Sequence, residues 1–116
     1  MLLIYLDEQA LSESEREQCY RDSTQLAHQL DVAGQYVAAA PLQPTATATS
    51  VRVRGGKRVV TDGPFAETKE QLGGYFLIDA SDRDEAIAIA ARIPMAHRGT
   101  IEVRPVIPIA DLPEVR

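Results

Sequence analysis

The sequence has a single cysteine, Cys19, no tryptophan and only two phenylalanines among its 116 residues. One cysteine excludes a disulfide within the chain and fits a reducing compartment. Long hydrophobic runs are also absent. The opening run, residues 2–6, meets Asp7 and Glu8 at once and is too short for a signal peptide or a membrane span. We therefore expect a cytoplasmic protein that does not enter a membrane.

Basic residues are in the minority. The chain has 12 Lys and Arg against 17 Asp and Glu, a formal net charge of −5. This balance argues against non-specific binding to nucleic acid, which depends on cations that neutralise phosphates, and against an anionic membrane surface. Paired Cys or His metal motifs, a glycine-rich phosphate loop and a Gly-x-Ser-x-Gly elbow are missing too. We expect no metal, nucleotide or flavin cofactor.

What is present indicates one globular domain over residues 1–116. Hydrophobic residues make up 45% and charged residues 25%, which are ordinary proportions for such a domain. Ser12 and Glu15 form a capping box that begins a helix, and Gly34 ends it after about residue 31. Strands are predicted at residues 2–6, 35–42, 45–54 and 57–61, the last two joined by a hairpin turn at Gly55-Gly56.

The second half contains a strand, a helix and a strand. After a turn at residues 62–64 the pattern predicts a helical turn or two over residues 65–71. Gly73-Gly74 then release the chain into a strand over residues 75–80. An acid-rich turn at residues 81–85 begins the next helix, and Pro94 ends it. The final strand is predicted at residues 100–106, and a proline-punctuated tail at about 107–116.

The order of these elements predicts the fold class. Strand, helix, strand, hairpin, strand, helix and strand form a split βαβ arrangement with an inserted hairpin, which indicates a ferredoxin-like α+β sandwich. Such a sheet carries its helices on one face. Residues 2–6 and 75–80 are apolar at both alternating positions, so the other face should be covered as well. A second copy of the chain is the simplest cover, and we expect a homodimer.

The most distinctive segment is Asp62-Gly63-Pro64, which follows a predicted strand and leads into a charged stretch. Gly63 permits backbone angles that other residues avoid, and Pro64 fixes its own φ. The turn therefore holds the carboxylate of Asp62 beside the charges of Glu67 and Lys69. A rigid loop with concentrated charge is a common way to build a binding or catalytic site.

Three segments of the chain are similar to a known family: residues 62–70 (DGPFAETKE), 73–76 (GGYF) and 101–106 (IEVRPV). They resemble the DGPF-motif branch of the YCII-related family, and the similarity extends from the opening strand to Val106. The resemblance implies a ferredoxin-like domain that pairs into a dimeric α/β barrel. In YCII-type relatives an Asp–His pair is the proposed active site, and that His lies on the first helix near the position of Ser23 in this chain.

Asp62 and His97 are the candidate catalytic residues. Asp62 suits a general base or a ligand anchor, but an Asp in this position also caps a helix or closes a turn. His97 follows the last helix, and its imidazole titrates near neutral pH, so it suits a general acid. An exposed loop histidine without a catalytic role is the alternative. The sequence alone does not show whether the two side chains meet.

Five further residues are candidate substrate-binding groups. Arg52 and Arg54 share a strand face and suit a carboxylate or phosphate, although basic residues also protect an edge hairpin from aggregation. Glu67 and Lys69 suit polar substrate groups or a solvated, ion-paired surface. Tyr75 offers a ring and a hydroxyl to a cleft, or packs in the core or dimer interface.

Two functions follow from these candidates. The first is a small cofactor-independent enzyme that uses acid/base chemistry on a small polar or aromatic metabolite. The second is a non-catalytic dimeric module that binds a small-molecule ligand or a protein. The family resemblance implies a link between the second function and sigma-factor regulation. In the second function the Asp62 turn is a structural signature of the fold.

Overall fold

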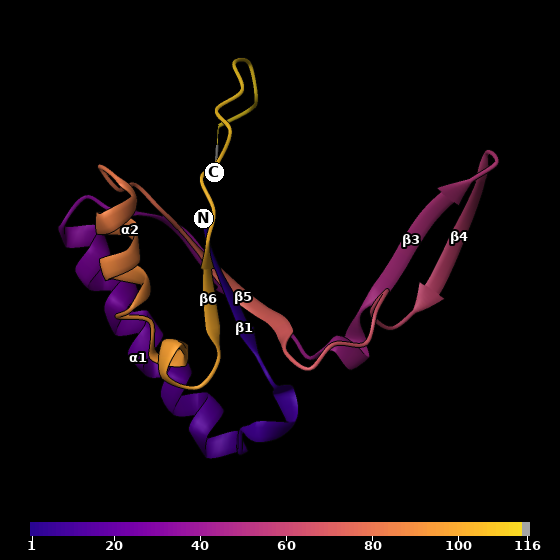
Figure 1. Ribbon diagram of the computed structural model, residues 1–116, viewed down its shortest axis with the longest axis horizontal. Coiled ribbons are helices and arrows are strands. Elements are labelled where there is room, and N and C mark those ends of the chain that lie inside the picture. Colours follow the sequence, from indigo (N-terminus) through magenta and orange to yellow (C-terminus); the bar gives the residue numbers. More distant parts are fainter. Residues whose placement is uncertain (115–116) are drawn as a thin grey trace.

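The structure is a computed structural model that describes residues 1–114. Figure 1 shows the helices and a four-stranded sheet at one end of the molecule and a separate hairpin at the other. The elements in chain order are β1 (Leu2–Leu6), η1 (Glu8–Ala10), α1 (Glu13–Val32), β2 (Tyr36–Pro41), η2 (Thr45–Thr47), β3 (Thr49–Arg54), β4 (Lys57–Asp62), β5 (Gln71–Ile78), α2 (Arg83–Ala90), η3 (Pro94–His97) and β6 (Thr100–Val103).

The main sheet has the order β2-β5-β1-β6, and its neighbouring strands are antiparallel. The two central strands, β1 and β5, pair Leu2 with Phe76 and Ile4 with Gly74. The register then shifts, so that Tyr5 pairs with Leu72 and Gly73 forms a bulge. The predicted α+β class, with an antiparallel sheet, two helices and an inserted hairpin, is confirmed.

Local signals determine where α1 begins and ends. The Ser12 hydroxyl accepts a hydrogen bond from the Glu15 amide, and the Glu15 carboxylate accepts one from the Ser12 amide, so the predicted capping box is present. At the other end Gly34 has a φ of 75°. This left-handed conformation suits glycine and terminates the helix.

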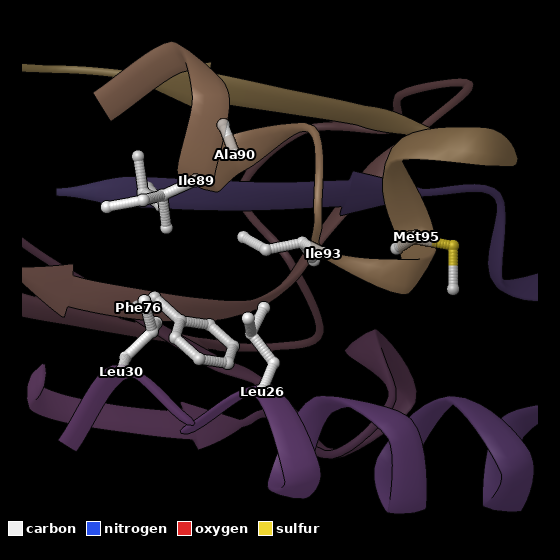
Figure 2. Packing of buried hydrophobic residues seen from close by; sticks show 8 residues of the cluster. Leu26, Leu30, Phe76, Ile89, Ala90, Ile93 and Met95 are labelled. Carbon is white, nitrogen blue, oxygen red and sulfur yellow. The ribbon is translucent and has the colours of Figure 1, made fainter. Parts of the chain in front are cut away.

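The hydrophobic core lies between the two helices and one face of the sheet. Figure 2 shows Phe76 of β5 beside Leu26 and Leu30 of α1, with Ile93 opposite. Leu30 and Ile93 are fully buried. Burial of each such side chain contributes roughly 1.5–3 kcal/mol to the stability of the fold. These contacts hold α1, β5 and the segment after α2 together.

The other face of the sheet carries no helix. Strand alternation places Leu3, Tyr5, Leu77 and Glu102 there, because their neighbours Leu2 and Phe76 are buried on the helix side. The first three side chains are apolar or aromatic and only half-buried. This surface matches the apolar second face that the sequence predicted.

Strands β3 and β4 form a hairpin that we call the arm, residues 49–62. Figure 1 shows it projecting from the end of the main sheet. Gly55 and Gly56, with φ of 58° and 73°, make the predicted two-residue turn at its tip. The Cα radius of gyration is 16.1 Å, whereas a compact chain of this length has about 13 Å. The chain therefore extends well beyond a compact globule.

One predicted helix is absent, and three predicted strand boundaries differ from the structure. Residues 65–70 form an irregular loop and no helix; there the Thr68 hydroxyl donates to the Glu70 carbonyl, and the Gln71 side-chain amide donates to the Thr68 carbonyl. Strand β3 begins at Thr49, since residues 45–47 form a 3₁₀ turn. Gly73-Gly74 lie inside β5, not before it. Strand β6 ends at Val103. Of the predicted tail, residues 107–114 contain no strand or helix, and residues 115–116 lie outside the described residues.

Within residues 1–114, no helix combines the length and apolar character that spanning a membrane requires.

Candidate functional site

A groove of about 450 Å³ opens between α1 and the sheet. Its volume lies within the range of small-molecule sites. Its apolar lining comes from both central strands and from the segment after α2, and includes Ile4, Leu6, Phe76, Ile93 and Met95. An apolar molecule of metabolite size therefore fits against the end of the hydrophobic core.

Small side chains on α1 create this space. Cys19, Ser23 and Ala27 follow one another at intervals of four residues and line the groove, one turn apart. Larger residues at these positions would fill the gap between the helix and the sheet. Glycines do the same on the opposite wall, since Gly73 and Gly74 present no side chain to the groove.

The rim of the groove is polar and carries both signs of charge. Arg16 and His28 of α1 line it, and so does Glu8 of η1. Arg16 is half-buried, whereas His28 is exposed. The groove thus joins an apolar floor to a rim that can bind a charged or hydrogen-bonding end of a ligand.

Cys19 is the one nucleophilic thiol in the lining. It is half-buried and forms no disulfide. Burial raises the pKa of the Cys19 thiol, which outweighs the opposite effect of the nearby Arg98 guanidinium. The thiol is therefore protonated at neutral pH. Cys19 lines the groove as a weakly polar side chain and is not an activated nucleophile.

Glu8 connects the groove to the base of the arm. Its carboxylate accepts a hydrogen bond from the Thr45 amide at 2.9 Å and another from the Thr45 hydroxyl at 2.8 Å. The Glu8 amide in turn donates a hydrogen bond to the side-chain oxygen of Gln71 at 3.1 Å. The rim residue is thereby fixed against both chain segments that lead into and out of the arm.

The turn at Asp62 lies at the base of the arm. The Gly63 amide donates to the Ala48 carbonyl at 2.7 Å, and the Ser50 hydroxyl donates to the Gly63 carbonyl at 2.8 Å. Gly63 has a φ of 96°, so the glycine is required for this conformation. The Asp62 carboxylate takes part in neither bond and is exposed. No helix follows it, so the helix-capping explanation of Asp62 is wrong.

The other charged candidates lie in two places outside the groove. Arg52 and Arg54 are exposed on the arm, on the face opposite Val51 and Val53. Glu67 and Lys69 are exposed in the irregular loop between β4 and β5. The helical turn expected around these two residues does not form.

The last two candidates lie on the body of the molecule. His97 ends η3 and is exposed. No hydrogen bond joins it to Asp62 in the described part of the chain. Tyr75 contributes atoms to the groove, but it alternates along β5 with the buried Phe76. Its side chain therefore points from the opposite face of the sheet, which leaves its backbone as the contact with the groove.

The groove was not predicted from the sequence, although one signal pointed to it. The apolar stripe of the first helix is unusually weak, with Cys19, Ser23 and Ala27 where large residues would normally pack. A helix that buries small residues against a sheet leaves either a close contact or a cavity, and only the tertiary structure distinguishes the two. Over residues 1–114, no group of three His, Cys, Asp or Glu side chains is arranged to hold a metal.

Comparison with known proteins gives two matches. The YCII-related domain matches residues 1–110 of the chain. An uncharacterised protein of Rhizobium meliloti (strain 1021) is 41% identical over 109 residues, which cover 90% of this chain and 88% of that protein. Both matches include the helix that lines the groove and the whole of the arm.

Proposed function

Because the chain belongs to the YCII-related family, we propose that it is a dimeric ferredoxin-like domain of the DGPF-motif branch that binds a small molecule in the groove between α1 and the sheet. The groove itself carries the proposal: a space of about 450 Å³ with an apolar floor and a charged rim. Sites of this size and composition are typical for small ligands.

The dimer is proposed from the open face of the main sheet. Leu3, Tyr5 and Leu77 lie on this face, which the helices do not cover. Packing of this face against a second copy would remove apolar surface from water. Each Å² of apolar surface buried contributes about 25 cal/mol of favourable free energy. A twofold pair joined by these faces is the arrangement that the family resemblance implies, the dimeric α/β barrel.

The lining defines the class of ligand. Phe76, Ile93 and Met95 suit an aromatic or branched aliphatic body. Arg16 and His28 at the rim suit a polar or anionic end. A metabolite with an apolar body and one acidic or hydroxyl group satisfies both parts. Strongly charged, fully polar molecules leave the floor unfilled.

Binding is testable with a probe of this chemistry, 8-anilinonaphthalene-1-sulfonate, which has an aromatic body and an anionic end. We expect saturable fluorescence enhancement. Cys19 is the chain's single thiol and lines the groove, so occupancy should also slow its alkylation by iodoacetamide, measured by mass spectrometry. Unchanged alkylation at saturating probe would contradict binding in the groove.

A matched pair of variants locates the probe. Ser23→Trp fills the groove, whereas Gln25→Trp places the same ring on an exposed position of the same helix. We expect Ser23→Trp to abolish probe binding and Gln25→Trp to leave it intact, with circular dichroism confirming that both variants fold. Equal binding by the two variants would place the probe elsewhere.

Acid/base catalysis with Asp62 is the second candidate function. The observation that favours it is that the exposed Asp62 carboxylate neither caps a helix nor joins the hydrogen bonds of its own turn. In this proposal Asp62 is the base, His97 the acid, and Arg52, Arg54, Glu67, Lys69 and Tyr75 contact the substrate. No metal or cofactor is involved. Because Asp62 and His97 are not bonded within one chain, the second protomer has to bring them together.

Substitution of the acid and base tests this candidate once a substrate is identified. Asp62→Asn and His97→Gln should each lower kcat by about 100-fold or more while the fold and the dimer persist. Glu17→Gln, which alters an exposed carboxylate of α1 outside both the groove and the arm, serves as the control for Asp62. Unchanged turnover in Asp62→Asn would remove the catalytic role and leave the binding function.

A further inference from the structure

The arm has an apolar face that one chain leaves in water. Directly paired residues of an antiparallel hairpin lie on the same face, so Val51 and Val60 share a face with Val53. Their side chains are 60%, 55% and 63% exposed. An isolated two-stranded hairpin is at best marginally stable in water. The arm therefore needs a surface to pack against.

The opposite face of the arm is basic. Arg52, Arg54 and Lys57 lie on it together with Val59. The fourth positive charge of the arm, Arg58, pairs with Val53 and therefore lies on the valine face. Residues 49–61 contain no acidic residue, although the chain as a whole has a net charge of −5. The rest of the molecule therefore carries a larger negative charge than the net charge of the whole chain, and the arm is positively charged.

These observations suit a second copy of the same chain as the partner. The exposed valines require an apolar surface, which phosphate groups do not offer, and the basic residues are complementary to the acidic body of another copy. The extended shape also favours a partner. Figure 1 shows the arm projecting away from the sheet and helices of its own chain, and the radius of gyration is 16.1 Å. An arm of this kind is available for exchange between protomers.

We propose that in the dimer each arm docks its valine face, formed by Val51, Val53 and Val60, onto the body of the other protomer. Asp62 lies on this face as the partner of Thr49. Docking therefore brings the Asp62 carboxylate of one protomer to the surface of the other. This inference rests on the proposed dimer and adds a second contact to the pairing of the sheets.

Hydrogen–deuterium exchange of the full chain tests the docking directly. The arm amides outside the hairpin's own hydrogen bonds exchange freely in a solvated arm and slowly in a docked one. We expect arm protection at concentrations where the protein is dimeric, and its loss on dilution to monomer. A dimer with an unprotected arm overturns the docking and leaves the sheet-face dimer intact. A chain that stays monomeric at all concentrations overturns both.

Cross-linking in mixed dimers shows whether the contact is between chains. A carbodiimide joins Lys57, the first residue of β4 beside the turn of the arm, to carboxylates close to it. A mixture of ¹⁴N- and ¹⁵N-labelled protein distinguishes links between chains from links within a chain. We expect hybrid-mass links from Lys57 to the acidic body. Links within one chain alone overturn the proposal.

A matched pair of variants separates the two faces of the arm. Val51→Ser with Val60→Ser alters the docking face, and Arg52→Ser with Thr61→Ser alters two positions of the other face. We expect the valine pair to raise the dimer dissociation constant at least tenfold by sedimentation, and to change it more than the control pair does. Equal effects of the two pairs contradict valine-face docking. Protection of the arm by added duplex DNA, but not by dimerisation, assigns the arm to nucleic acid and overturns the proposal.

Discussion

Glu8 and Thr45 form a two-point contact between the rim of the groove and the base of the arm. The carboxylate accepts from the Thr45 amide at 2.9 Å and from its hydroxyl at 2.8 Å, although 37 residues separate the two positions. The contact is half-buried, so water replaces it poorly. It joins the rim of the groove directly to the base of the arm.

Removal of this contact is the first prediction. Glu8→Ala leaves the Thr45 amide and hydroxyl without their acceptor, and we expect a loss of about 1–2 kcal/mol in the free energy of unfolding. Urea denaturation measures it. The neighbouring Gln9→Ala changes an exposed side chain and should cost less than about 0.5 kcal/mol. Equal losses in the two variants would show that the contact does not stabilise the fold.

The second prediction concerns the close approach of Gly99 and Tyr5. A Cβ at residue 99 would lie 2.0 Å from the Tyr5 carbonyl oxygen, which belongs to the rigid backbone of β1. Gly99→Ala should therefore destabilise the protein by roughly 3 kcal/mol or more, the range of severe steric conflicts.

Gly34→Ala is the matched comparison for this variant. A Cβ there meets nothing within 4 Å, but the φ of 75° is strained for alanine, at a cost of about 1–2 kcal/mol. Thermal or urea unfolding of both variants measures the difference. A cost for Gly99→Ala no larger than that for Gly34→Ala would contradict the tight packing of residue 99 on β1.

The third prediction is a loss of stability in acid that originates at the helix starts. Hydrogen bonds from the Ser12 amide and hydroxyl, and from Arg98, lower the pKa of Glu15. The amide and hydroxyl of Ser81, with Gln35, lower that of Glu85. Folding therefore favours the ionised carboxylates. Their stabilisation is complete above the ordinary pKa near 4.5 and is lost as the pH falls through the folded-state values.

The double variant Glu15→Gln with Glu85→Gln tests this origin. Glutamine keeps a side-chain acceptor but does not titrate, so the free energy of unfolding should fall less steeply below pH 4.5 than in the natural sequence. Glu13→Gln changes an exposed acid in the same first turn and is the control. An unchanged slope in the double variant would show that other carboxylates cause the acid loss.

The fourth prediction concerns the reactivity of Cys19. Burial raises the pKa of its thiol above the ordinary value of 9.0, and only the thiolate is alkylated. At pH 7.5 iodoacetamide should therefore react more slowly with the folded protein than with the same chain in urea. In the folded protein the midpoint of the rate plotted against pH should lie above the ordinary value of 9.0. Equal rates in the folded and unfolded chain would contradict a shielded thiol.

The sequence predicted the elements whose signals are local. Ser12, Glu15 and Gly34 define α1 through hydrogen bonds and backbone angles within a few residues of each other. Gly55-Gly56 define the arm in the same way. The helix expected over residues 65–71 was wrong, because the folded chain offers these residues other hydrogen bonds. The Thr68 hydroxyl donates to the Glu70 carbonyl, and the Thr100 hydroxyl donates to the Glu70 carboxylate at 2.9 Å.

The candidate site shows the same division. Asp62 was recognised because glycine and proline mark a rigid turn wherever they stand side by side in a sequence. The groove went unrecognised, because its lining comes from α1, both central strands and the segment after α2, which meet only when the chain is folded. That Asp62 and His97 act together remains a prediction, because no hydrogen bond joins them in the described part of the chain.

The sequence by itself therefore determined the helix starts, the hairpin turn, the alternation of the strands and the family. These depend on the residues' own backbone preferences and on neighbours no more than four positions away. The tertiary structure alone decided that small side chains on α1 face a sheet across a cavity, that Gly99 packs on Tyr5, and that the arm extends away from the core. Those outcomes depend on which distant segments share a volume, and that is fixed by the packing of Leu26, Leu30, Phe76 and Ile93 between helix and sheet.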